Sequence, residues 1–111
     1  MKIPTLSLAT ALLAFQVGVW ASTTGSISGT LTDPSGSVIP GVKLIVTDTA
    51  KGIQKKTTTD AKGDYSFPSL PVGRYDLKME AQSFRPQNRT GLIIDIDSVL
   101  KVDATLELAE I

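Results

Sequence analysis

The residue types that most often carry out catalysis or bind metals are largely missing from this sequence. It contains no cysteine and no histidine, which removes thiol chemistry, the commonest general base and the commonest metal ligand. Asp60 and Asp64 superficially resemble part of a calcium loop, and Asp95 and Asp97 form a second acidic pair. An EF-hand needs about five or more ligating positions, and glycosidase carboxylates face each other across a cleft. We interpret the first pair as a hairpin turn and the second as a solvated strand face, and we expect no cofactor, no metal site and no catalytic residue.

The longest predicted loop carries the best candidates for a contact surface. It runs from Ser83 to Gly91 and contains Phe84, Arg85 and Arg89. Phe84 is the one aromatic side chain outside the predicted core of the mature chain. Exposed aromatic rings bind the apolar faces of sugars, whereas loops in general also contact proteins. We expect these three residues to touch a protein partner or, alternatively, a glycan.

The elements that position these residues are predicted to be strands. Apolar and polar residues alternate with a period of two, for example at Tyr75, Leu77 and Met79, so each strand has one buried and one solvated face. The expected strands lie near residues 26–32, 42–48, 53–59, 64–67, 74–81, 92–97 and 99–108. Turn-forming residues separate them, and no crossover helices are predicted. The sequence therefore predicts an all-β, seven-strand antiparallel sandwich of two sheets.

The N-terminal segment has the pattern of a secretory signal peptide. Lys2 is followed by the mostly apolar stretch from Leu6 to Trp20, and a small residue, Ala21, precedes Ser22. This is the charge, apolar-core and cleavage-site order that signal peptidase recognises. We expect residues 1–21 to be removed and residues 22–111 to form one domain. The mature protein would be secreted or periplasmic, with no membrane span.

Three segments together resemble a known family. They are GTLTDPSGSVIPGVKLIV at residues 29–46, TTDAKGDYSF at 58–67 and LPVGRYDLKMEAQSF at 70–84. In this order they resemble the carboxypeptidase regulatory-like domain, a transthyretin-like Greek-key sandwich that is related to Cna-B-type modules. Such domains occur beside peptidases, in surface stalks and at the N-termini of TonB-dependent receptors. One departure is Ser83, where the family usually has glycine, which leaves the conformation of that turn open.

These features favour a non-catalytic exported module of the cell envelope. Its expected role is protein–protein interaction or structural support, and its expected partner is an envelope protein. The alternative is a carbohydrate-binding module, because this resemblance extends to carbohydrate-binding-like folds. The sequence holds eleven basic and eleven acidic residues, and no basic stretch is longer than Lys55-Lys56, so we expect no nucleic-acid partner. The oligomeric state is left open.

Export can be tested directly. We expect signal peptidase to cleave between Ala21 and Ser22, because the small residue before that bond fits the enzyme's specificity. Intact-mass spectrometry of the protein recovered from its native host should give a chain that begins at Ser22. An intact Met1 terminus in the membrane fraction would contradict the interpretation.

Overall fold

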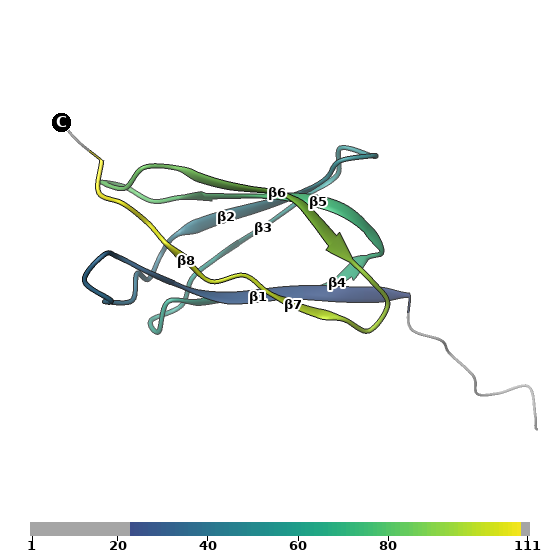
Figure 1. Cartoon of the computed structure of the whole chain (residues 1–111), viewed down its shortest axis with the longest axis horizontal. Helices are drawn as coiled ribbons and strands as arrows, with labels where there is room; N and C mark the ends of the chain where they lie inside the picture. Colours follow the sequence, from purple (N-terminus) through teal and green to yellow (C-terminus); the bar gives the residue numbers. More distant parts are fainter. Residues whose placement is uncertain (1–22, 110–111) are drawn as a thin grey trace, which may run out of the picture.

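The protein consists of strands and turns over the residues that its structure describes (Figure 1). The structure is a computed structural model, and it describes residues 23–109. The predicted signal peptide and its cleavage site between Ala21 and Ser22 lie outside this range. No helix within 23–109 has the length and apolar character needed to cross a membrane.

The first sheet is built around β1 (Thr24–Thr32). Its residues alternate between the two faces of the sheet, and Ile27 and Leu31 are completely buried. β1 pairs antiparallel with β4 (Asp64–Pro71) and parallel with β7 (Val99–Lys101) and β8 (Ala104–Thr105). The last two strands therefore lie along the same side of β1, one after the other.

The second sheet has four antiparallel strands. Their order is β3-β2-β5-β6, with bounds Gln54–Thr58 for β3, Lys43–Asp48 for β2, Gly73–Glu80 for β5 and Gln87–Ile94 for β6. The pairing of β5 with β6 shifts register around Asp76, where Gly91 has a φ of 69°. The backbone N–H of Gly91 donates to the Asp76 carboxylate, which secures this bulge.

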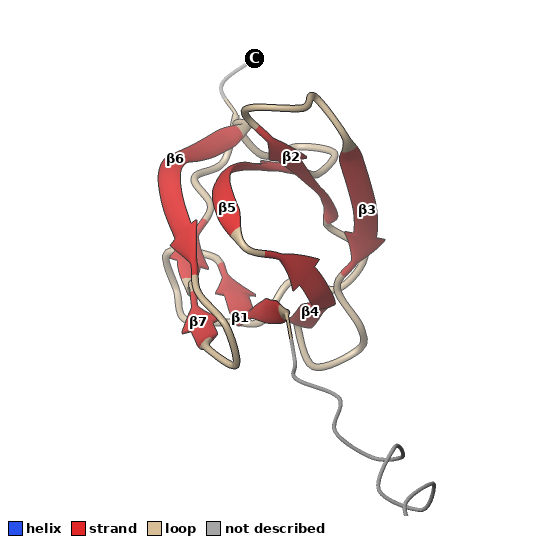
Figure 2. Cartoon of the chain, turned by 90° about the vertical axis from the view of Figure 1, so that its right-hand side faces the viewer, coloured by secondary structure: helices blue, strands red, loops and turns tan. Residues whose placement is uncertain are grey.

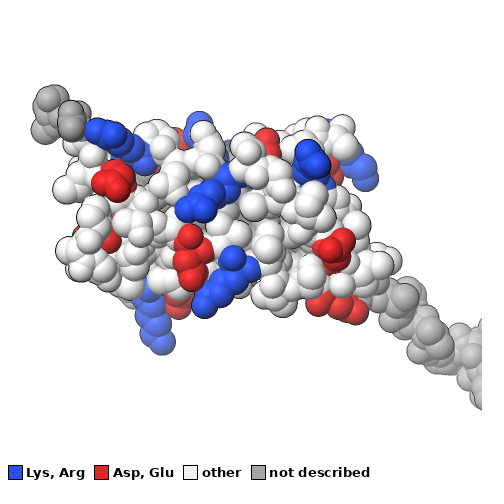
Figure 3. Space-filling view, viewed as in Figure 1, with Lys and Arg blue, Asp and Glu red and all other residues white. Residues whose placement is uncertain are grey.

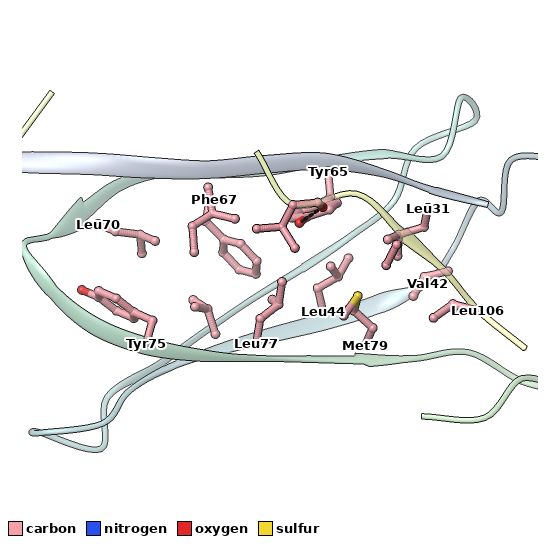
Figure 4. Close-up of a cluster of buried hydrophobic side chains, with 14 of the residues drawn as sticks. Leu31, Val42, Leu44, Tyr65, Phe67, Leu70, Tyr75, Leu77, Met79 and Leu106 are labelled. Atoms are coloured by element: carbon pink, nitrogen blue, oxygen red, sulfur yellow. Dashed lines mark hydrogen bonds between the residues drawn. The ribbon is translucent and has the colours of Figure 1, made fainter. Parts of the chain in front are cut away.

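The core fills the space between the two sheets (Figure 4). Both sheets contribute large apolar side chains to it, and the buried set comprises Ile27, Leu31, Ile39, Val42, Leu44, Val46, Tyr65, Phe67, Leu70, Tyr75, Leu77, Met79, Ile94, Val102, Ala104 and Leu106. The rings of Tyr65 and Phe67 meet edge to face, with centroids 6.1 Å apart. The predicted all-β, two-sheet sandwich is confirmed, as is the burial of the alternating apolar residues.

Four details differ from the sequence-based expectation. β7 and β8 pair parallel with β1 although no helix connects them to it, because the chain reaches them by crossing from the other sheet at residues 95–98. The expected strand 99–108 is broken at residues 102–103. The expected loop 83–91 is largely strand, since β6 begins at Gln87. The described chain thus has eight strands, and Asp95 and Asp97 lie in a turn instead of on a strand face.

The register of β5 predicts opposite outcomes for two neighbouring substitutions. Leu77 is completely buried, so Leu77→Ala should lower the free energy of unfolding by about 2–5 kcal/mol, as core truncations do. Lys78 is exposed to solvent and forms an exposed ion pair with Glu80. Lys78→Ala should therefore change the free energy of unfolding by less than about 0.5 kcal/mol. Urea unfolding of both variants measures this. Similar losses at the two positions would show that the register is wrong.

Candidate functional site

The two sheets separate along the side of the sandwich where β3 and β4 lie. These consecutive strands belong to different sheets (Figure 1, Figure 2). The turn between them is fixed by the carboxylate of Asp60, which accepts the N–H groups of Lys62 and Asp64 at 2.9 and 3.0 Å. No backbone hydrogen bond joins β3 to β4 in the described part of the chain. A hollow lies between the two strands near this turn, and an apolar pocket lies near Ile53 and Pro71. We call the two together the β3–β4 groove.

An apolar pocket lies at the far end of the β3–β4 groove. Its volume is about 60 Å³, and its lining is Val46, Asp48, Lys51, Ile53, Lys55, Leu70, Pro71 and Tyr75. Val46, Leu70 and Tyr75 belong to the core, whereas Ile53 is 58% exposed and stands at the rim. Small-molecule sites usually measure about 300–1,000 Å³. This pocket therefore suits a single aliphatic side chain and not a substrate-sized ligand.

Hydrogen bonds hold the walls of the pocket in place. The Tyr75 hydroxyl donates to the Pro71 carbonyl at 2.6 Å, which fixes the corner between β4 and β5. Burial raises the pKa of Tyr75, and the nearby Asp48 carboxylate adds to this effect. The Asp48 carboxylate itself accepts the N–H groups of Ala50 and Lys51. Both polar groups therefore serve the turns around the pocket.

The backbone of β3 presents unpaired groups on the outer side of this strand. The hydrogen bonds from Asp48 N to Ile53 O and from Thr59 N to Val42 O show that Ile53 and Thr59 direct their backbone groups towards β2. In an antiparallel ladder alternate residues point their N–H and C=O the same way. The alternate residues Gln54, Lys56 and Thr58 therefore direct their N–H and C=O groups away from β2.

The charge around the β3–β4 groove is positive on its β3 side. Residues 49–59 contain Lys51, Lys55 and Lys56 and no acidic residue. The Lys55 ammonium reaches across the groove to the Ser69 carbonyl at 3.5 Å. On the face drawn in Figure 3, in contrast, acidic and basic side chains are interspersed. The lysines of β3 thus give one sheet edge a local positive potential.

The predicted contact residues Phe84, Arg85 and Arg89 lie elsewhere, on the β6 side of the molecule. Phe84 is half-buried, because its ring packs against the core, and its contact with a partner stays a prediction. The backbone around it pairs with the C-terminal segment: Arg85 N donates to Glu107 O at 2.8 Å and Ala109 N to Ser83 O at 2.9 Å. Ser83 adopts a φ of 74°, the left-handed conformation that glycine favours.

Arg85 and Arg89 are both exposed, and their contact with a partner stays a prediction. The Arg89 guanidinium donates a hydrogen bond to the Gln87 side chain, and its positive charge acts to lower the pKa of Tyr65. Burial, together with the nearby Asp103 carboxylate and against the opposing charge of Arg89, raises the pKa of Tyr65 to about 12. The Tyr65 hydroxyl donates to the Val102 carbonyl at 2.6 Å. This cluster connects β4 to the C-terminal segment.

The acidic pairs considered from the sequence lie in or beside turns. Asp60 holds the hairpin turn, as predicted, and Asp64 accepts a hydrogen bond from the Thr30 hydroxyl. Asp95 takes part in the turn between β6 and β7 through its backbone N–H and carbonyl, both of which hydrogen-bond the Ser98 hydroxyl. Within residues 23–109 no group of three or more acidic side chains is arranged to hold a metal ion.

Sequence reasoning missed the β3–β4 groove. A usable signal was present, since the predicted strand 53–59 contains Ile53 and then no further apolar residue. A strand without an apolar face is typical of a sheet edge that is exposed to water on both sides. The pocket behind Ile53 had no local signal, because its walls come from strands far apart in the sequence.

Comparisons with known proteins agree with this architecture. A solved structure of catechol 1,2-dioxygenase from Acinetobacter radioresistens has a TM-score of 0.64 at 12% identity, covering 91% of this chain and 55% of the enzyme. A proposed carbohydrate-binding protein from Bacteroides uniformis has a TM-score of 0.60 at 18% identity, covering 74% and 40%. At such identities the likeness concerns the fold alone.

Sequence comparisons are more specific. The TonB-dependent transporter Oar of Myxococcus xanthus is 34% identical over 83 residues, which are 73% of this chain and 8% of that protein. The chain therefore spans less than a tenth of this relative's length. A sequence model of the carboxypeptidase regulatory-like domain matches residues 26–107, almost all of the described strands. The chain belongs to the carboxypeptidase regulatory-like domain family.

Proposed function

We propose that this protein is a non-catalytic module of the cell envelope that binds another polypeptide. The observation that carries this proposal is the β3–β4 groove, which offers backbone groups and room for one side chain. Those are the features a sheet edge uses to bind an extended peptide. A small substrate would instead need a larger pocket with converging polar groups.

The chemistry of the ionisable side chains argues against catalysis. Hydrolysis at neutral pH requires an activated nucleophile, a base or a metal in a cleft. The sequence has neither cysteine nor histidine, and the carboxylates of Asp48 and Asp60 already accept backbone N–H groups in turns. Membership of a regulatory-like domain family agrees with a role in which the module acts through its surface.

Two observations support a location in the cell envelope. The N-terminal segment has the pattern of a signal peptide, and a relative of this chain is a TonB-dependent transporter. Because the matched region is 8% of that transporter, we do not extend transport itself to this chain. The described chain also enters the sandwich at one end and leaves it at the other (Figure 1). This arrangement suits a module that gives structural support between two neighbours.

Carbohydrate binding is the competing possibility. The outer face of the second sheet has a hollow of about 340 Å³, lined by Ile45, Thr47, Asp76, Leu77, Lys78, Asn88 and Thr90. Its polar side chains, which are those of Thr47, Asp76, Lys78, Asn88 and Thr90, can form hydrogen bonds to sugar hydroxyls. However, sugar sites usually add an aromatic ring for stacking, and Tyr65, Phe67 and Tyr75 are buried in the core. The missing ring favours a polypeptide partner.

The two possibilities predict different results with the full-length protein. In its native host, a lysine-reactive crosslinker should join it to envelope polypeptides, and the joined peptides should include Lys51, Lys55 or Lys56. The purified protein should give no signal on a glycan array, and it should not turn over peptide, ester or glycoside substrates with or without Zn²⁺ or Ca²⁺.

Two results would contradict the proposal. A glycan-array signal that disappears in Asn88→Ala, which alters the polar hollow, would establish sugar binding. Asn88 is exposed, so this variant is expected to fold, whereas Phe84→Ala would also disturb the core. Turnover of any substrate that is abolished by a single Asp or Ser substitution would identify an enzyme.

A further inference from the structure

We propose that the β3 edge binds an extended partner segment of alternating acidic and aliphatic residues, which joins the second sheet as a fifth strand beyond β3. This inference rests on the proposed function, because it specifies the chemistry of the polypeptide that the module binds. It follows from three features of the β3–β4 groove: backbone groups, an apolar pocket and positive charge.

The backbone groups come first. Gln54, Lys56 and Thr58 point their N–H and C=O groups outwards, and no neighbouring strand in the described structure pairs with them. An added strand would form main-chain hydrogen bonds with these residues, whatever its sequence. Such bonds supply affinity, and the side-chain contacts then decide which segment is chosen.

The other sheet edges are less suited to an added strand. On β4, Pro68 has no N–H, and both backbone groups of Asp64 already bond within the turn at Asp60. β7 has three residues. β6 carries the bulge at Gly91, and the segment just before it pairs with the C-terminal residues. Bulges, prolines and short strands are the usual means of blocking an edge.

The apolar pocket selects the side chains that face inwards. On a strand added to β3, alternate side chains would lie on the same face as Ile53 and Lys55, above the opening between the sheets. The pocket there is about 60 Å³ and is lined by Val46, Leu70 and Tyr75. One aliphatic side chain fills such a space, and burying it removes apolar surface of both partners from water.

The lysines select the side chains that face outwards. Lys56 lies on the outer face of β3, opposite Ile45, where an acidic residue of an added strand would be its cross-strand neighbour. Opposite charges in such positions attract, and like charges repel. Lys51 and Lys55 add positive potential at the rim of the pocket. The same lysines oppose pairing between two β3 edges, so they disfavour a second copy and admit an acidic partner.

The test uses the full-length mature protein and a defined probe. The probe is a blocked heptapeptide of alternating glutamate and valine, and its control carries lysine in place of glutamate. Binding is followed by ¹H–¹⁵N NMR, with protein variants Lys56→Glu and Ile53→Ser. Both positions are exposed, so these substitutions should leave the fold intact. Lys101→Glu on β7 is the matched control, since its side chain is 72% exposed and lies in the other sheet.

The acidic peptide should shift and protect the amides of Gln54, Lys56 and Thr58, with an affinity that falls as salt rises. Lys56→Glu should weaken binding roughly tenfold or more, because it replaces an attraction by a repulsion. Ile53→Ser should weaken it several-fold, and Lys101→Glu less than about twofold.

Equal binding of the lysine peptide, or shifts that centre on β6 and β7, would overturn the inference. So would the absence of any shift at millimolar peptide. If crosslinks to envelope proteins persist in that case and map to other surfaces, the proposed function stands and the peptide specificity of the β3 edge is rejected.

Discussion

The packing of Val102 against β1 at Gly29 is the constraint on which the course of the C-terminal segment depends. A Cβ atom at Gly29 would lie 2.0 Å from the Val102 carbonyl oxygen, far inside van der Waals contact. The same oxygen accepts the Tyr65 hydroxyl, and Val102 N donates to Ser28 O at 2.8 Å. The C-terminal segment can therefore follow β1 only because this position lacks a side chain. Tyr65, from β4, holds the segment there.

The course of the C-terminal segment past Val102 determines which side of the sandwich stays open. Past Val102 the chain forms β8 beside β1, and residues 107–109 then pair with residues 83–85 ahead of β6. The C-terminal segment thereby connects the two sheets along the β6–β7 side. No comparable segment covers the opposite side within the described structure. The β3 edge, its lysines and the apolar pocket remain accessible there, so the location proposed for partner binding follows from how the core is closed.

Much of this fold could be predicted from local patterns. Alternation at Leu44, Val46, Tyr75 and Leu77 gave the correct buried faces, because a strand with one wet face must alternate. The strand at Gln87–Gly91 was missed, since Pro86, Asn88 and Gly91 are turn formers and the bulge at Gly91 disrupts the alternation. The parallel pairing of β7 and the pocket behind Ile53 depend on contacts between distant segments, which no local pattern reports.

The most direct test of this constraint is the free energy of unfolding of the Gly29→Ala variant. Gly29 has no positive φ, and at such sites alanine usually stabilises a protein by about 0.4–1 kcal/mol, because it restricts the unfolded chain. Here the added methyl group would collide with Val102, so we expect a loss of about 1–3 kcal/mol in urea unfolding. Ser28→Ala, at the neighbouring position on the other face of β1, should stay within about 0.5 kcal/mol. A neutral or stabilising Gly29→Ala would contradict the constraint on which the closed side of the sandwich depends.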